Sequence, residues 1–252
     1  MLETELVGER LSLAYRDLIP EEARLGEALA RRGIRIGAPL ADQWTTLDEY
    51  LGLYGRGLSP AGMVVFAGRP DEGSRATGIP FTGAPEARDV LGLDARGDAR
   101  SPAGAPFWRA VDAARAQAQG APVEAFFGSV HLAHAQPFDF PPEPEVREAA
   151  SRHVLRVLEA TRPQAIACVG AAAVLVVGRA LANSALVDLA SAREGTWTER
   201  WPPGTRLSAF PYAEVPAARP YRARLVPVPS LVGATAALGE RALAHAFSYV
   251  LA

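Results

Sequence analysis

Lysine is absent from the sequence, so all 26 basic residues are arginines. This absence excludes a Schiff base on a side chain, because only lysine supplies a side-chain amine, and imine chemistry would need the N-terminal amine. Cysteine occurs once, as Cys168, which excludes an internal disulfide and a cluster held by four thiolates. The abundance of Ala, Gly, Pro and Arg is typical of a genome rich in G and C, and we attribute the missing lysine to that cause.

Long apolar segments are also missing. The longest run, AIACVGAAAVLVVG at 165–178, is interrupted by glycine and is shorter than the ~20 residues of a membrane-spanning helix. The first ten residues, MLETELVGER, are acidic and have no apolar stretch behind a basic start, so we expect no signal peptide. These absences predict a cytoplasmic protein with no membrane partner.

The remaining composition is that of an ordinary globular protein. Hydrophobic residues make up 49% of the 252 residues and charged residues 21%. This length suffices for one sizeable α/β core or for two small domains. The net charge of −2 gives no overall field that favours nucleic acid, so local arginines and backbone amides would have to hold any polyanion.

Short apolar runs alternate with helical patterns along the chain. We predict buried strands at 62–68, 123–132, 164–170 and 224–230. We predict helices at 20–32, 45–55, 84–93, 105–119, 142–163, 171–182 and 231–252. The alternation predicts a three-layer α/β/α sandwich with a largely parallel central sheet, in which ligands bind where the strands end. The functional loops should therefore follow residues 68, 132, 170 and 228.

We predict a single domain over residues 1–252. Residues 1–44 form a helical N-terminal extension, and residues 183–222, rich in Pro, Trp and Arg, form a divergent insertion. The loop with the most unusual composition is AGRPDEGSRATGIPFTG at 67–83, directly after the first predicted strand. Its glycines would let the backbone approach a ligand closely, and successive N–H groups in such a loop can face an anion.

Four segments together resemble the uracil-DNA glycosylase superfamily, closest to its single-strand-selective monofunctional members. VVFAGRPDEGSRATGIPFTGAPEARDVLGL is similar to the family's G-M-N-P-G, T-G-V-P-F-G and R-D-W-L-G motifs. PFWRAVDAARAQAQGAPVEAFFGSVHLAHAQPFDF is similar to its F-W helix, F-F strand and H-N-L-C-P-L loop. AIACVGAAAVLVVGRAL resembles the V-V-G-V-G strand and helix, and VPVPSL stands where the family has L-H-P-S-P. The similarity runs from about residue 45 to the end and is weakest over 183–222.

The resemblance implies a DNA glycosylase of base excision repair. Such an enzyme flips the target base into a close-fitting pocket and hydrolyses its N-glycosidic bond. By this resemblance Gly68, Arg69, Pro70, Phe81 and His134 bind the substrate. Phe81 would be the aromatic platform for the base, a stack worth about 1–3 kcal/mol. The alternative, that Phe81 is a core residue in a glycine-rich turn, stays open.

Three substitutions depart from the family pattern. Arg69 replaces the asparagine that positions the attacking water, and a guanidinium only donates hydrogen bonds. His134 replaces the asparagine that reads the uracil edge, and an imidazole offers single nitrogens where the amide offers a paired fork. Val228 replaces the histidine that steadies the leaving base, and losing one such donor typically costs about 10²–10³ in rate. We therefore expect weak activity on plain uracil and a different damaged or deaminated base as substrate.

Asp71 and His134 are the candidate catalytic residues. An ion pair between Arg69 and Asp71 would keep the carboxylate ionised and ready to accept a hydrogen bond from water. The alternative is that Asp71 and Glu72 are solvated loop charges. His131 and His134 lack the spacing of a helical metal pair, and we predict neither a metal nor another cofactor.

Candidate DNA contacts lie in two loops. Arg75, Ser230 and Leu231 are the candidates, and Arg219, Arg222 and Arg224 are further possible phosphate contacts. Leu231 is placed like the apolar wedge that some family members push into the base stack. It is equally placed to pack inward at the start of a helix.

Three functions remain open from the sequence. The first is a monofunctional glycosylase acting on single-stranded or lesion-bearing duplex DNA, working as a monomer. The second is a catalytically silent member that binds DNA or a flipped base. The third is a scaffold that binds a partner and keeps only the fold, because a fold alone does not fix a function.

Overall fold

The structure is a computed structural model that describes residues 2–35, 37, 40–55, 58, 62–182, 193–196, 211–216 and 222–251. The strands of the described residues form one sheet in the order β2-β1-β3-β6-β5-β4. Their bounds are β1 Met63–Ala67, β2 Val130–His134, β3 Ala165–Val169, β4 Arg193–Thr196, β5 Pro211–Pro216 and β6 Arg222–Val228. Strands β2, β1, β3 and β6 are mutually parallel, and β5 and β4 add an antiparallel edge next to β6.

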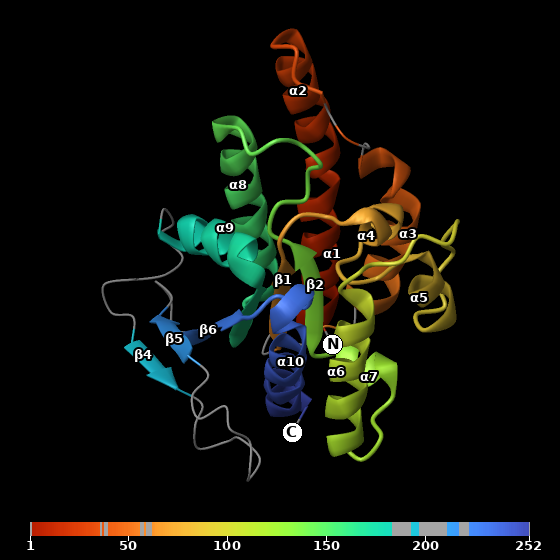
Figure 1. The fold of residues 1–252 in the computed structure, drawn as a ribbon, viewed down its shortest axis with the longest axis vertical. Helices are drawn as coiled ribbons and strands as arrows, with labels where there is room; N and C mark the ends of the chain where they lie inside the picture. The colour runs from red at the N-terminus through yellow and green to blue at the C-terminus, as the bar shows by residue number, and fades with distance from the viewer. Residues whose placement is uncertain are drawn as a thin grey trace.

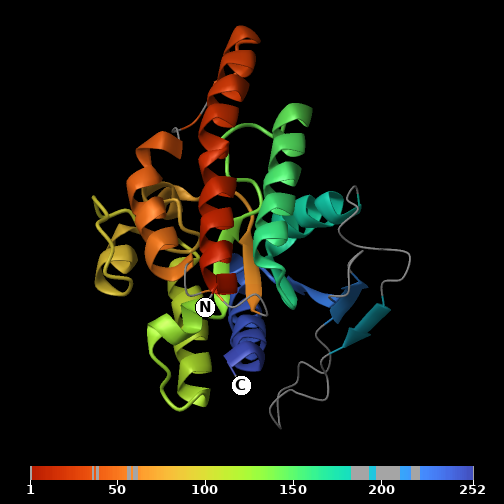
Figure 2. The ribbon, with the colours of Figure 1, turned by 180° about the vertical axis from the view of Figure 1, so that it is seen from behind.

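Helices cover both faces of this sheet. Their bounds are α1 Leu2–Arg16, α2 Leu18–Arg31, α3 Trp44–Tyr50, α4 Glu72–Thr77, α5 Ala84–Asp89, α6 Gly104–Gln117, α7 Val123–Phe127, α8 Pro144–Thr161, α9 Gly170–Ala182 and α10 Ala236–Leu251. Helices α6 and α10 pack together in front of the sheet in Figure 1, while α1 and α8 lie in front in the reverse view of Figure 2. The predicted three-layer sandwich with a parallel central sheet is confirmed.

The central strands are buried along their whole length. Every residue of β1, β2 and β3 is buried, which explains why β1 and β3 appear in the sequence as continuous apolar runs without alternation; β2, VHLAH, buries two histidines as well. The chain leaves β1 towards α6 on one face and leaves β3 towards α9 on the other. Ligands in open α/β sheets bind outside the strand ends at such a reversal, so the ends of β1 and β3 mark the expected site.

The N-terminal extension is built into one of the helical layers. Helices α1 and α2 run nearly end to end, and α1 packs along α8 (Figure 2). Leu11, Tyr15 and Leu18 are buried in the common hydrophobic core. Helices α1 and α2 therefore stabilise the domain directly.

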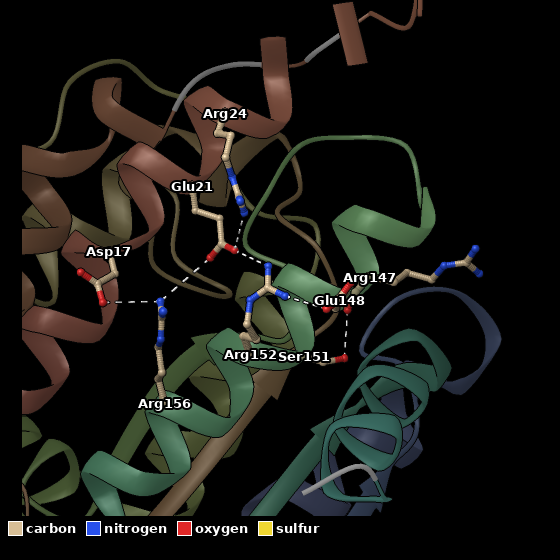
Figure 3. Close-up of polar contacts among 8 residues, drawn as sticks. All are labelled: Asp17, Glu21, Arg24, Arg147, Glu148, Ser151, Arg152 and Arg156. Carbon is tan, nitrogen blue, oxygen red and sulfur yellow. Dashed lines mark hydrogen bonds and ion pairs between the residues drawn. The ribbon is translucent and has the colours of Figure 1, made fainter. Parts of the chain in front are cut away.

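A buried carboxylate joins α2 to α8. Glu21 accepts a 2.5 Å hydrogen bond from Arg152 and lies 3.5 Å from Arg24 and 4.0 Å from Arg156. Figure 3 shows the three arginines converging on Glu21 from the two helices, with Asp17 pairing Arg156 at the edge of the cluster. We call these five residues the Glu21 cluster.

One local prediction was wrong. Residues 123–127 form helix α7 and only 130–134 form a strand, because Pro122 precedes the first turn of a helix that Gly128 ends. A short apolar run carries no period that separates these two structures. Helix α3 begins after its N-cap Gln43, and the Thr46 hydroxyl donates to the Asp94 carbonyl at 2.8 Å.

The divergent segment 183–222 is described only in part. Its strands β4 and β5 extend the sheet, where the sequence suggested only a divergent insertion. Trp197, Trp201 and Arg219 lie outside the described residues, and of Arg222 only the backbone is described. No helix within the described ranges combines the length and the apolar character that a membrane span requires.

Candidate functional site

Four loops meet at the carboxyl edge of the sheet. They follow the ends of β1, β2, β3 and β6 at Ala67, His134, Val169 and Val228, close to the predicted positions. The loops after β1 and β2 are tied together, because the backbone N–H groups of 135 and 136 donate to the carbonyls of 67 and 68 at 2.8 and 3.1 Å. Side chains from neighbouring strands are thereby brought to one edge.

Two glycines of the 67–83 loop make room for the chain itself. A Cβ on Gly73 would lie 2.1 Å from the Ser101 nitrogen, and one on Gly83 would lie 2.4 Å from the Ala99 carbonyl oxygen. Backbone segment 99–101 therefore passes directly against both glycines. At these two positions the backbone lies close to this segment, and not to a ligand as expected.

Phe81 is a buried residue with an unusual backbone. Its φ of 61° lies in the left-handed region, where a bulky side chain is strained, and its ring stacks on Phe107 at 4.7 Å and 14°. The Thr77 hydroxyl donates to the Thr82 carbonyl at 2.7 Å and helps hold this turn. Because one face of the ring is covered by Phe107, a stacked base would have to use the other face.

Asp71 is the N-cap of α4. Its Oδ1 accepts from the Ser74 backbone N–H at 2.8 Å and from the Ser74 hydroxyl at 2.9 Å, and its Oδ2 accepts from the Ser101 hydroxyl at 2.6 Å. The side chain is therefore neither paired with Arg69 nor a freely solvated charge, and both sequence interpretations are corrected for Asp71. Glu72 is exposed, as the second interpretation expected.

Arg69 turns towards the loop after β2. Its Nη2 lies 3.9 Å from Oδ1 of Asp139, and Nη2 of Arg75 lies 3.1 Å from the same oxygen. Because 52% of the Arg69 side chain is exposed, its guanidinium does not fill a closed interior space. Asp139, the acid in AQPFDF, was not singled out from the sequence, where its position after a buried strand was the available signal.

His134 is buried at the end of β2 with both ring nitrogens unpartnered among the described residues. The residue is 5% exposed, and burial lowers the pKa of its imidazole to about 4, against the opposing effect of the Asp71 charge. The ring is therefore neutral at physiological pH, and Asp71 lies near enough to influence it. A buried polar group without a partner costs about 1–3 kcal/mol, so these nitrogens have unused capacity for a ligand.

The other histidine of β2 has a structural role. His131 Nε2 lies 3.2 Å from the Tyr15 hydroxyl, and its ring stacks on Tyr50. Burial lowers the pKa of His131 to about 3. Its contacts come from α1 and α3, so it braces the N-terminal helices against the sheet.

The loop after β6 does not present Leu231 as a wedge. Leu231 is buried in the core, and a Cβ on Gly239 of α10 would lie 3.1 Å from its Cδ2. The exposed apolar side chain of this loop is its neighbour Val232, at 45%. Ser230 accepts a hydrogen bond from the Val232 N–H at 3.2 Å and so shapes the turn. Val228 is buried and offers no donor.

The described residues hold no group suited to a metal ion and no exposed thiol. In the ranges that the structure describes, no group of three or more His, Cys, Asp or Glu side chains is placed to hold a metal ion. Cys168 is buried inside β3, and burial raises the pKa of its thiol well above the usual value. A thiolate nucleophile at this position is therefore disfavoured.

Neither the comparison with protein-family models nor the comparison with curated proteins finds a match for this sequence. The likeness to uracil-DNA glycosylases rests on the quoted motifs and on their order along the chain.

Proposed function

We propose that this protein is a DNA glycosylase-like protein of base excision repair. It takes a damaged or deaminated base, flipped out of DNA, at the carboxyl edge of the sheet and hydrolyses its N-glycosidic bond. The observation that carries the proposal is the buried, neutral His134 with two unpartnered nitrogens beside Asp71. A flipped base has hydrogen-bonding groups along its edge that would satisfy these nitrogens.

The chemistry of His134 favours a base other than uracil. A neutral imidazole offers one N–H donor and one acceptor, on nitrogens that point in different directions. The paired donor and acceptor along one uracil edge suit an amide fork better. A base that presents a single strong donor or acceptor towards His134 is therefore the better ligand.

Asp71 has capacity left to orient a water molecule. An ionised carboxylate has about four acceptor sites, and three hydrogen bonds to Asp71 are present, one of them on Oδ2. Water bound to Oδ2 would attack C1′ of the flipped nucleotide while the bond from C1′ to the base nitrogen breaks. The water proton passes to Asp71, and the base leaves with the bonding electrons and takes a proton from solvent, to which Asp71 releases the proton that it accepted.

A second function, binding of the flipped base without excision, is favoured by two observations. The Asp71 carboxylate already caps α4, and Val228 leaves the leaving base without the donor that the family supplies. In this case His134 and Phe81 would still hold the base.

An excision assay separates the two functions. Oligonucleotides with uracil, hypoxanthine, xanthine or oxidised pyrimidines are incubated with the protein, and abasic sites are then cleaved with alkali. Strand breaks should appear for at least one damaged base, should be weak for uracil, and should disappear in Asp71→Asn. Asn caps helices as well as Asp does, so this variant keeps α4 and changes the charge.

The matched control is Glu72→Gln, one residue along the same loop, which should cleave as the wild type does. Absence of breaks, together with salt-dependent DNA binding that Phe81→Ala abolishes, would support binding without excision. Absence of both breaks and binding would overturn the proposal and leave a scaffold function.

A further inference from the structure

We propose that Asp139 is the positioning residue of a phosphate clamp formed by Arg69 and Arg75. The clamp takes a phosphodiester group of a nucleic-acid strand. This inference rests on the proposed function, since the strand that carries the flipped base would supply the phosphate. It assigns a role to a residue that the sequence motifs leave without one.

The two guanidinium groups converge on a single atom. Arg75 approaches Oδ1 of Asp139 at 3.1 Å and Arg69 approaches the same oxygen at 3.9 Å, although Arg69 lies in the loop after β1 and Arg75 lies on α4. One carboxylate faces two guanidiniums, which leaves one positive charge without compensation inside this group. A phosphodiester carries the single negative charge that would complete it.

The clamp is open on its outer side. Asp139 is 13% exposed, whereas the side chains of Arg69 and Arg75 are 52% and 37% exposed. Each guanidinium has five N–H donors, and the contacts to Asp139 engage one terminal nitrogen of each. The Nε of Arg75 is buried and has no hydrogen-bond partner among the described residues. Arginines with unused donors of this kind bind phosphate oxygens well.

Gly37, in the connection that follows α2, helps to fix the position of the Asp139 carboxylate. The Gly37 N–H donates to the Asp139 carbonyl at 3.0 Å, and a Cβ on Gly37 would lie 2.1 Å from Asp139 Oδ2. Glycine at this position therefore leaves the space that the carboxylate occupies. The chain is held again three residues after Gly37, where Glu22 Oε2 accepts a hydrogen bond from the Leu40 N–H at 2.6 Å. Asp139, in the loop after β2, is thus held in place by the connection that follows α2.

If Asp139 positions the two arginines, its replacement changes the affinity for a polyanion in the opposite direction to that expected from charge alone. Replacing Asp139 by Asn removes a negative charge, which by charge alone would strengthen the binding of a polyanion. If Asp139 holds the two arginines at one point, its loss lets them separate and weakens binding. The direction of the change therefore decides between a positioning residue and a mere surface charge.

The test measures binding of an undamaged single-stranded oligonucleotide at several salt concentrations. The Asp139→Asn variant should bind about tenfold more weakly than the wild type. The slope of log affinity against log salt should fall by about 0.7 for each phosphate that the variant no longer neutralises. Gly37→Ala should act in the same direction, because its Cβ displaces the carboxylate. The charge control Glu72→Gln should bind as well as the wild type or better.

A double-mutant cycle excludes a general loss of structure. In an Arg69→Ala and Arg75→Ala background, Asp139→Asn should cause no further weakening, and thermal unfolding of each variant checks the fold. Asp139→Asn binding as tightly as Glu72→Gln, or a wild type that does not bind, would overturn the inference. Weaker binding in Asp139→Asn without any base excision would keep the clamp and overturn the proposed enzyme. Base excision together with unchanged DNA affinity in Asp139→Asn would keep the proposed enzyme and overturn the clamp.

Discussion

At the scale of single residues, buried groups that stay uncharged are the most informative feature. His153 on α8 is fully buried, its nitrogens have no partner among the described residues, and its ring packs in a T-shaped pair with Tyr15, the ring centroids 5.0 Å apart. Burial lowers the pKa of His153 to about 3, with smaller contributions from His131, His134 and Arg156. The folded protein therefore excludes protons that the unfolded chain would bind at mildly acidic pH.

Replacing His153 by Leu should reduce the acid sensitivity of the fold. Between an unfolded pKa near 6.5 and the folded value, only the unfolded state takes up the proton, so unfolding becomes easier as pH falls. One such histidine contributes up to about 1.4 kcal/mol per pH unit. Urea unfolding between pH 6.5 and 4.5 should show a smaller slope for His153→Leu than for the wild type. Equal slopes would mean that His153 is hydrated or charged in the folded state.

Glu22 has the opposite pH dependence. Burial raises the pKa of its carboxyl from 4.5 to about 7, although the Leu40 N–H opposes the shift. The folded state then keeps a proton that the unfolded state releases above pH 4.5. The contribution of Glu22 to stability therefore falls as pH rises from 4.5 towards 7, and it stays constant above about pH 7. Gln keeps the acceptor for the Leu40 N–H and cannot ionise.

Glu22→Gln should therefore gain stability over the wild type as pH is raised from 5 to 8. Urea midpoints at these two pH values provide the measurement, and Glu27→Gln, an exposed position on the same helix, is the control. If the urea midpoints of Glu22→Gln and the wild type differ by the same amount at both pH values, the pKa of Glu22 is not raised by burial.

At the scale of elements, the Glu21 cluster is the polar connection between α2 and α8. A buried carboxylate that loses its charge leaves its arginines uncompensated, and breaking a buried pair typically costs about 3–5 kcal/mol. Because the three arginines are partly exposed, we expect a smaller cost, about 2–3 kcal/mol, for Glu21→Gln.

Thermal unfolding measures this cost. At about 2–4 °C per kcal/mol for a chain of this size, Glu21→Gln should lower the melting temperature by about 4–12 °C. The control Glu27→Gln removes an exposed pair with Arg31 on α2 and should cost less than about 0.5 kcal/mol. Similar shifts for the two variants would show that Glu21 is no more than a surface charge.

The order of the elements was predictable because their signals are local. Buried parallel strands appear as short apolar runs, and the long amphipathic helix α8 shows its acidic start and its stop near Pro163. Helix α7 was missed because five residues of VEAFF carry no period. The glycines at 73 and 83 were assigned to a ligand because nothing local shows that segment 99–101 lies against them.

At the scale of the whole molecule, parallel strands fix which loops meet, but they do not fix which side chains pair. The sequence predicted that the loops after β1 and β2 lie together, and this places Asp71 near His134. It paired Arg69 with Asp71 by proximity along the chain, whereas the partner is Asp139, seventy residues away. The burial of Leu231 likewise depends on α10, which packs against its side chain.

A consequence of the whole composition can be tested without any variant. Since no lysine is present, a glycosylase reaction would proceed through water and not through a side-chain imine. Borohydride added during reaction with a damaged oligonucleotide should trap no adduct on a side chain, as mass spectrometry of peptides would show. An adduct mapped anywhere but the N-terminal amine would contradict this expectation.

The most direct measurement is the ring ¹⁵N spectrum of His134. In protein labelled with ¹⁵N-histidine, the resonances that disappear in His134→Leu identify this ring. Addition of an oligonucleotide with the preferred damaged base should shift the His134 nitrogens at equimolar ratio, as their free positions gain hydrogen bonds, and should leave His153 unchanged. If DNA binds while the His134 nitrogens keep their shifts, no base reaches this edge of the sheet and the central proposal is wrong.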